Sequence, residues 1–203
     1  MSTSQRTERK WIDTRDAVVL AMFSVLSFLI ETTLGLILYA FSAIPLAGGM
    51  VSGIFDAILI FLGVFLVPRR GAALLFSLLL LTMSTVTPSF GPPGLYKVAI
   101  GVGLGAAIEV VLMIVGRSIK AYVFATGLAF ALSIPMTFWA WQWFGIPGAS
   151  ELRKMLLTFT GVYFAIGCVG ATIGAGIYRG RLQKHKMILD LREGINASSV
   201  AEE

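Results

Sequence analysis

The chain has 203 residues, of which 57% are hydrophobic and 13% are charged, with a net charge of +5 and a mean hydropathy of +0.85. Soluble domains carry about 25% charged residues, so this composition excludes an ordinary water-soluble domain and indicates an integral membrane protein. One cysteine, Cys168, and one histidine, His185, exclude a disulfide framework and a zinc site built from these residue types. We therefore expect no metal ion and no cofactor.

The N-terminal region begins with a basic leader, residues 1–16, followed by an apolar stretch at 17–40. The apolar core of a signal peptide is roughly 7–15 residues long, and this stretch is longer and has no small-residue cleavage site. We therefore expect the stretch to be retained as a first membrane helix, with the leader in the cytoplasm.

Five further apolar segments follow in chain order, at residues 47–67, 71–88, 95–116, 121–144 and 155–178. A membrane span takes roughly 20 residues, and the backbone must satisfy its own hydrogen bonds in lipid, so each segment is expected to be a helix. The sequence thus predicts an all-α fold, a single bundle of six transmembrane helices over 17–178. The basic tail, 179–203, is expected to be cytoplasmic and disordered at its end.

Basic residues gather in alternate connections of this bundle. They precede the first helix, follow the last, and occupy the second and fourth links, whereas the opposite links carry few. The positive-inside rule then places both termini in the cytoplasm. The positive charge has a topological explanation, so we expect no nucleic-acid partner.

Four ionisable residues interrupt the apolar segments: Glu31, Asp56, Lys97 and Glu109. Such groups cost about 2.5–3.5 kcal/mol at a helix centre and tend to face the bundle interior. With a rise of 1.5 Å per residue, Glu31 and Asp56 each lie roughly 14 Å from the outer helix end, and Lys97 lies at the outer mouth. These three are expected to share a cavity in the outer half, with Glu109 below it. The alternative is a purely structural role in interhelical hydrogen bonds or a lysine–carboxylate pair.

Aromatic residues mark the outer end of the fifth segment, at Trp139, Trp141 and Trp143. They fit an interfacial aromatic belt, or one or two of them line a pocket that holds a flat, cationic ligand by stacking and cation–π attraction. Residues two apart do not share a helix face, so all three cannot line it. The substrate-binding candidates are Glu31, Asp56, Tyr96, Lys97, Trp139, Gln142, Trp143 and Tyr163.

Small residues four apart occur in three helices, as Ala17 with Ala21, Gly101 with Gly105, and Gly170 with Gly174. This spacing lets helices approach closely. The sequence contains no P-loop, zinc-protease motif or nucleophile elbow. We therefore expect neither an enzyme nor an ATPase of its own.

The pattern of about 200 residues, six helices, cytoplasmic termini and a basic leader running into Ala17 and Ala21 resembles the substrate-binding (S) components of energy-coupling factor (ECF) transporters. The resemblance implies a subunit in the cytoplasmic membrane of a prokaryote, with no transport power alone. Ala17 and Ala21 would contact a transmembrane coupling subunit that works with two ABC ATPases. The outer loops, 87–97 and 138–154, would close over a small vitamin-like substrate.

Two stretches, "PRRGAALL" from Pro68 and "GVGLGAAIEVVL" from Gly101 to Leu112, look similar to the thiamine-precursor (hydroxymethylpyrimidine) branch of that family. The Met-His start of the cobalt and nickel members is absent, which disfavours a metal substrate. Two other functions stay open. One is a stand-alone transporter that uses Glu31, Asp56 or Glu109 as a proton relay, and the other is a membrane scaffold protein that binds no small molecule.

Overall fold

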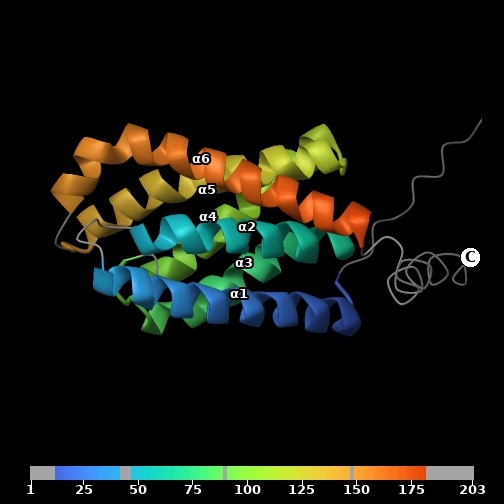
Figure 1. The fold of residues 1–203 in the computed structure, drawn as a ribbon, viewed down its shortest axis with the longest axis horizontal. Coiled ribbons are helices and arrows are strands. Elements are labelled where there is room, and N and C mark those ends of the chain that lie inside the picture. The colour runs from blue at the N-terminus through green and yellow to red at the C-terminus, as the bar shows by residue number, and fades with distance from the viewer. Residues whose placement is uncertain (1–11, 42–46, 89–90, 147–148, 182–203) are drawn as a thin grey trace, which may run out of the picture.

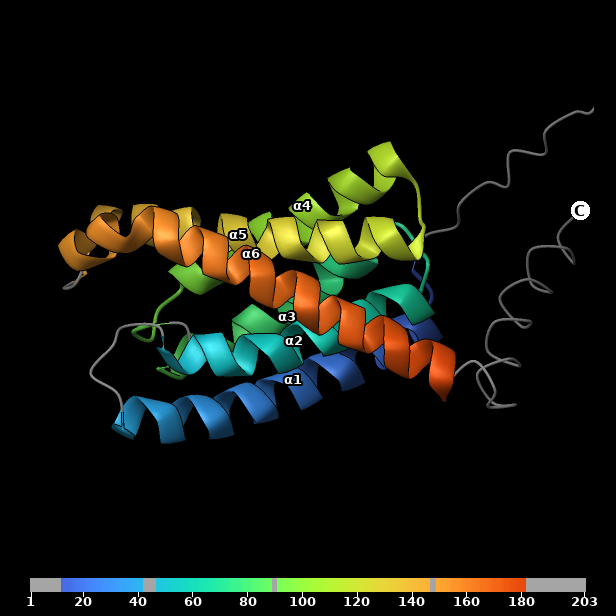
Figure 2. The ribbon, with the colours of Figure 1, turned by 45° about the horizontal axis from the view of Figure 1, so that its top comes forward.

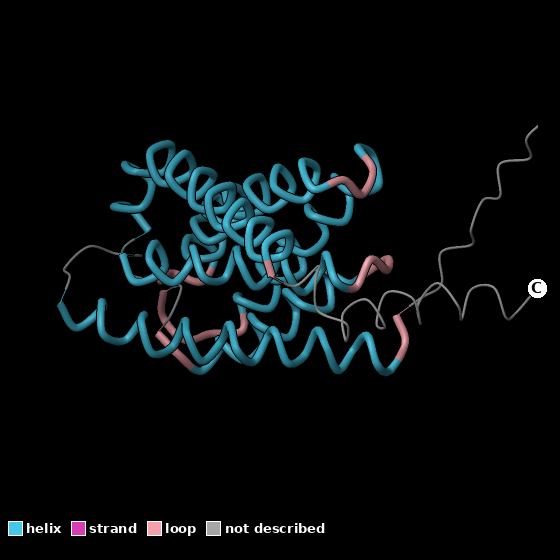
Figure 3. The backbone as a smooth tube through the Cα atoms, turned by 45° about the vertical axis from the view of Figure 1, so that its right-hand side comes forward, coloured by secondary structure: helices cyan, strands magenta, loops and turns pink. Residues whose placement is uncertain are grey.

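The computed structural model describes residues 12–41, 47–88, 91–146 and 149–181, and every regular element within these ranges is helical (Figures 1 and 3). The tail beyond 181 and most of the basic leader lie outside the described residues. The predicted all-α bundle is confirmed. Its elements are α1 (Thr14–Phe41), α2 (Ala47–Leu66), α3 (Ala72–Met83), the 3₁₀ turn η1 (Ser84–Val86), α4 (Tyr96–Val115), α5 (Ile119–Trp143) and α6 (Ala149–Gly180).

Five of the described helices, α1, α2, α4, α5 and α6, are long and apolar enough to cross a membrane. The third predicted span, 71–88, is shorter than expected, because the apolar helical stretch there ends at Val86. Thr87 is extended, with φ −107° and ψ 157°, and it precedes Pro88. A residue before proline is disfavoured in the helical region, which explains why the helix ends here.

Successive helices run in opposite directions, so the start of α1 and the end of α6 lie at the same end of the bundle (Figure 1). We call this the inner end and the opposite one the outer end. α1 packs against α2 and α3, α2 packs against α6, and α4 lies between α3 and α5. α5 and α6 form a closely packed pair on the side of the bundle away from α1 (Figure 2).

Glycines permit the closest helix contacts, as their spacing predicts. A Cβ atom on Gly105 would lie 2.5 Å from the Cα of Leu74, and one on Gly170 would lie 2.6 Å from the carbonyl oxygen of Ile54. Both distances are shorter than real Cβ contacts, so only glycine allows α4 to approach α3, and α6 to approach α2, this closely.

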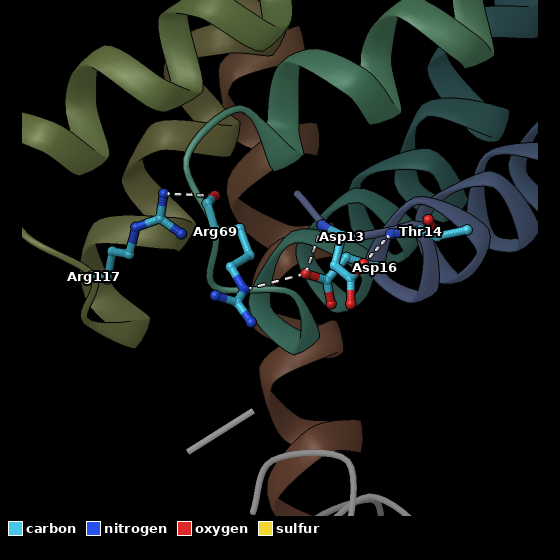
Figure 4. A network of polar contacts seen from close by, with 5 residues as sticks. All are labelled: Asp13, Thr14, Asp16, Arg69 and Arg117. Carbon is cyan, nitrogen blue, oxygen red and sulfur yellow. Dashed lines mark hydrogen bonds and ion pairs between the residues drawn. The ribbon is translucent and has the colours of Figure 1, made fainter. Parts of the chain in front are cut away.

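Two ion pairs join the helix ends at the inner end, and Figure 4 shows the one between Asp16 and Arg69. Arg69 Nε, from the α2–α3 link, lies 3.2 Å from Asp16 Oδ2 on α1, and Arg117 Nη2 donates to the carbonyl oxygen of Arg69 at 2.8 Å. Arg117 Nη2 also lies 3.2 Å from Glu109 Oε2, and Glu109 Oε1 accepts from the backbone N–H of Ala73 at 3.0 Å. Asp16 and Glu109 thus each pair with an arginine and accept a hydrogen bond from a backbone N–H. The network connects α1, α3, α4 and the α4–α5 link.

Asp16 also organises the start of α1 (Figure 4). Its Oδ2 atom accepts from the backbone N–H of Asp13 at 3.4 Å, while Asp13 Oδ1 accepts from the N–H of Thr14. A side chain at the third helical position that accepts from the backbone N–H of the capping residue forms one half of a capping box. This local pattern fixes the helix start at residue 14, three residues before the apolar segment begins.

Candidate functional site

A small cavity lies inside the bundle between α2, α3, α4 and α5. Its volume is about 20 Å³, which leaves room for about one water molecule. Apolar side chains form most of its wall, including Leu80, Leu81 and Ile100. Its polar lining comes from Asp56, Ser77, Lys97, Ser133 and Thr137.

Asp56 on α2 provides the carboxylate of this cavity. The residue is 1% exposed, and its Oδ1 atom accepts a hydrogen bond from the Ser27 hydroxyl on α1. Its Oδ2 atom has no hydrogen-bond partner among the described residues. A buried carboxylate oxygen without a donor is costly, so this atom is a ready acceptor for a group that enters the cavity.

Ser77 on α3 adds a second available polar atom. The side chain is 1% exposed, and its hydroxyl has no hydrogen-bond partner among the described residues. By contrast, the hydroxyls of Ser133 and Thr137 donate to carbonyl oxygens one turn earlier in α5, at 2.6 and 2.7 Å. Asp56 and Ser77 therefore supply the polar atoms that the surrounding helices leave available.

Glu31 on α1 lies beside the cavity and is fully buried. Its Oε2 atom accepts from the Ser84 hydroxyl at 3.0 Å, at the start of η1. Glu31 also lies within electrostatic range of Asp56, Lys97 and Tyr163. The structure therefore brings both predicted carboxylates of the outer half into one cluster.

Lys97 is the second residue of α4, and its side chain is fully buried. Its Nζ atom donates to the carbonyl oxygens of Ser84 at 3.0 Å, Thr87 at 2.7 Å and Gly91 at 3.2 Å. Carbonyl groups outside regular helix need donors at membrane depth, and the ammonium group supplies them. Lys97 thus lines the cavity, as its position in the sequence predicts, and also binds the α3–α4 connection. The sequence did not indicate this second role.

The two candidate tyrosines occupy different places. Tyr163 on α6 is fully buried, within electrostatic range of Asp56 and Glu31. Tyr96 is 4% exposed, and its hydroxyl donates to the carbonyl oxygen of Pro92 at 2.7 Å. Tyr163 belongs to the carboxylate cluster, whereas Tyr96 packs against the outer connection.

The three tryptophans of α5 lie on different faces of the helix, two exposed and one buried. Trp139 and Trp143 are 69% and 85% exposed, and with Tyr96 they line a surface groove between α4 and α5. Gln142 is exposed as well. Of the eight substrate-binding candidates, only Asp56 and Lys97 line the cavity. Trp141, which was not among the candidates, is 4% exposed, and a Cβ atom on Gly91 would lie 2.3 Å from its ring.

The remaining predictions concern the inner end and α1. Glu109 lies in the inner ion-pair network, below the cavity as expected. Ala17 and Ala21 are half-buried on α1, beside the exposed side chains of Val18 and Met22. No group of three or more His, Cys, Asp or Glu residues suited to a metal ion occurs among the described residues.

These features define a multi-pass helical membrane bundle with a buried polar cavity. No family model and no curated protein matches the sequence. Among solved structures, the chain is similar to "an S-component of ECF transporter", with 17% sequence identity and a TM-score of 0.59. The alignment covers 94% of this chain and 98% of that one, so the likeness extends over the whole bundle and shows a shared fold.

Proposed function

We propose that this protein is the substrate-capture subunit of an ECF-type importer in the cytoplasmic membrane of a prokaryote. The observation that carries the proposal is the cavity, where Asp56 Oδ2 and the Ser77 hydroxyl have no hydrogen-bond partner among the described residues. Buried polar atoms are nearly always satisfied, and exceptions call for a functional explanation. The shared S-component fold supports the same function.

The bound molecule is expected to be small, polar and vitamin-like. Asp56 Oδ2 would accept from an N–H or O–H group of the ligand, and Ser77 would donate or accept. A cavity of about 20 Å³ has to expand for such a ligand, so side chains such as Leu80 and Ile100 would have to move.

A thiamine-related ligand is the preferred candidate within this class, and its support is the resemblance of 68–75 and 101–112. In the structure, Gly101 and Gly105 pack against α3, and Glu109 belongs to the inner network. The two glycines therefore have packing roles, Gly101 against the backbone of the cavity residue Ser77, and Glu109 pairs with charges away from the cavity. A ligand panel has to decide between thiamine precursors and other vitamins.

Delivery of the ligand would need partners, because an importer of this type couples transport to ATP hydrolysis in other subunits. The outward face of α1 around Ala17 and Ala21 would contact the coupling subunit, which would bind two ABC ATPases. Replacing both alanines by leucine is expected to prevent co-purification of the coupling subunit while ligand binding stays intact. Loss of ligand binding in the same variant would count against this division of roles.

The direct test is binding by the purified protein. A panel of vitamins and precursors is screened by thermal unfolding in detergent, and the best ligand is then measured by calorimetry. Asp56→Asn is expected to weaken binding by roughly 10- to 100-fold, since hydrogen bonds to charged groups contribute about 1.5–3 kcal/mol. Asp13→Asn, an exposed carboxylate at the inner end, is the matched control. Equal affinity in Asp56→Asn, or no ligand in the panel, would contradict the proposal.

One observation favours a second candidate, a stand-alone proton-coupled transporter. Asp56, Glu31 and Tyr163 lie together within the bundle, and buried carboxylate chains serve as proton relays in such transporters. Proton-driven uptake by this protein alone in liposomes would establish that function. Uptake only in the presence of the coupling subunit and ATPases would exclude it.

A further inference from the structure

A second hollow lies at the inner end, on the outward side of α5 and α6. Its volume is about 570 Å³, within the roughly 300–1,000 Å³ that is typical of ligand pockets. The floor is largely apolar and includes Val123, Phe124 and Ala175. Lys120 and Arg179, both exposed, also line the hollow, one from each helix.

The crossing of α5 and α6 explains why the hollow is here. A Cβ atom on Gly167 would lie 2.8 Å from the Cα of Gly127, so the helices touch most closely near these glycines. From this point they diverge toward the inner end (Figure 2). Phe65 on α2 makes edge-to-face contacts with Tyr122 of α5 and Tyr178 of α6 and so connects the diverging helices. Gly176, on the hollow, has no atom within 4 Å of where its Cβ would be, which leaves the outward side open.

The two cations of the hollow differ from the other basic residues nearby. Arg69 and Arg117 are engaged by Asp16 and Glu109 in the inner network. No carboxylate lines the hollow among the described residues, so Lys120 and Arg179 give it a net positive charge. An apolar floor with two cations at the end of membrane helices is complementary to an amphiphile that carries a negative charge.

We propose that this hollow binds an anionic phospholipid, with an acyl chain along Val123, Phe124 and Ala175 and the phosphate group between Lys120 and Arg179. Basic hollows between membrane helices on the cytoplasmic side are suited to anionic headgroups, and the sequence places this end in the cytoplasm. α1 does not border the hollow, so a coupling subunit docked on α1 would leave the lipid site accessible. The site is separate from the polar cavity, and its occupancy does not depend on substrate capture.

The test is native mass spectrometry of the full chain in mild detergent with phosphatidylglycerol or with phosphatidylcholine of the same acyl chains. The protein is expected to retain phosphatidylglycerol in preference. Lys120→Gln with Arg179→Gln should lower retention of phosphatidylglycerol roughly 30-fold, because each of the two basic residues contributes about 1 kcal/mol near anionic lipid. Arg153→Gln with Lys154→Gln removes the same charge from the opposite end of α6 and should leave the preference unchanged.

A third variant, Gly176→Leu, fills the hollow without changing its charge. It should lower retention of both lipids, because the acyl chain loses its space. An unchanged preference in the Lys120/Arg179 variant would overturn the proposal, as would an equal loss in the Arg153/Lys154 control. A dimer that disappears in the Lys120/Arg179 variant, with no lipid bound to the monomer, would replace the lipid by a second copy of this chain. Thermal unfolding of each variant verifies that it is folded.

Discussion

The buried carboxylates at the two ends of the bundle differ in their partners. At the inner end, Asp16 and Glu109 each face an arginine at 3.2 Å, and Glu109 also accepts a backbone N–H. In the outer half, Asp56 keeps one carboxylate oxygen without a hydrogen-bond partner among the described residues, beside a serine hydroxyl in the same condition. Arg117 Nε and Nη1 at the inner end have no partner among the described residues either, but Arg117 lines no part of the cavity, whereas Asp56 and Ser77 do.

This difference separates structural charges from candidate binding groups. Removing one partner of a buried ion pair leaves the other charge uncompensated, so substitutions at the inner end should act on stability. A buried carboxylate oxygen or hydroxyl without a partner among the described residues forms no hydrogen bond that stabilises the bundle, so substitutions there should act on ligand affinity. The comparison fails if an inner-end variant loses affinity but not stability, or if an outer variant does the reverse.

The largest effect is expected for Glu109→Ala. The change leaves Arg117 without its carboxylate and the Ala73 N–H without its acceptor, so the free energy of unfolding should fall by about 3 kcal/mol. Thermal unfolding in detergent measures the loss. The folded fraction should bind ligand with unchanged affinity, and a selective loss of affinity would place Glu109 in the binding site instead.

A smaller loss of stability is expected for Gly105→Ala, where α3 and α4 meet. The added methyl group would overlap the backbone at Leu74, and overpacking of this kind costs about 1–3 kcal/mol. Gly161→Ala is the matched control, since no atom lies within 4 Å of its added Cβ in α6. If both variants unfold at the same temperature, the close approach of α3 and α4 does not contribute to stability.

Glu31→Gln tests the outer cluster. The amide retains the shape and an acceptor for the Ser84 hydroxyl, so membrane insertion and folding should be preserved. The loss of negative charge beside Asp56 and Lys97 should weaken ligand binding by roughly tenfold, or about 1.4 kcal/mol. Calorimetry with the ligand found for the wild type gives the affinity, and no change would assign Glu31 a structural role only.

The smallest effect is expected for Ser77→Ala. Its hydroxyl has no hydrogen-bond partner among the described residues, so the unfolding temperature should stay within error of the wild type. Affinity should fall by roughly two- to tenfold, because a neutral hydrogen bond contributes about 0.5–1.5 kcal/mol. Ser133→Ala serves as the comparison, because the Ser133 hydroxyl already donates to the carbonyl oxygen of Phe130. A variant as tight as the wild type would remove Ser77 from the site.

The sequence predicted the order and approximate limits of the helices, because long apolar segments leave few alternatives in a membrane. It was least accurate where polar residues continue a helix or a backbone restriction ends one. α6 begins at Ala149, six residues before the apolar segment, because a polar first turn is invisible to hydropathy. The third segment ends early because Thr87 precedes Pro88.

For the candidate site, the charged residues could be predicted, since carboxylates and lysines in apolar helices are conspicuous. Their partners could not, because the rotation of each helix decides which side chains meet. Ser77 and Ser84 were missed, since serines are ordinary in membrane helices and commonly bond to the preceding turn. The same rotation places Trp141 inside and Trp139 and Trp143 outside, a choice that composition alone does not make.

The short third helix has a consequence for the surrounding bilayer. α3 and η1 together span Ala72–Val86, about 24 Å of helix at ordinary rises, whereas the hydrocarbon layer is about 30 Å thick. The difference is a hydrophobic mismatch at one sector of the bundle only, which lipids meet by local thinning. The bilayer should therefore be thinner beside α3, at the outer end of the bundle. Water should come closest to Asp56 and Ser77 along this side of the protein.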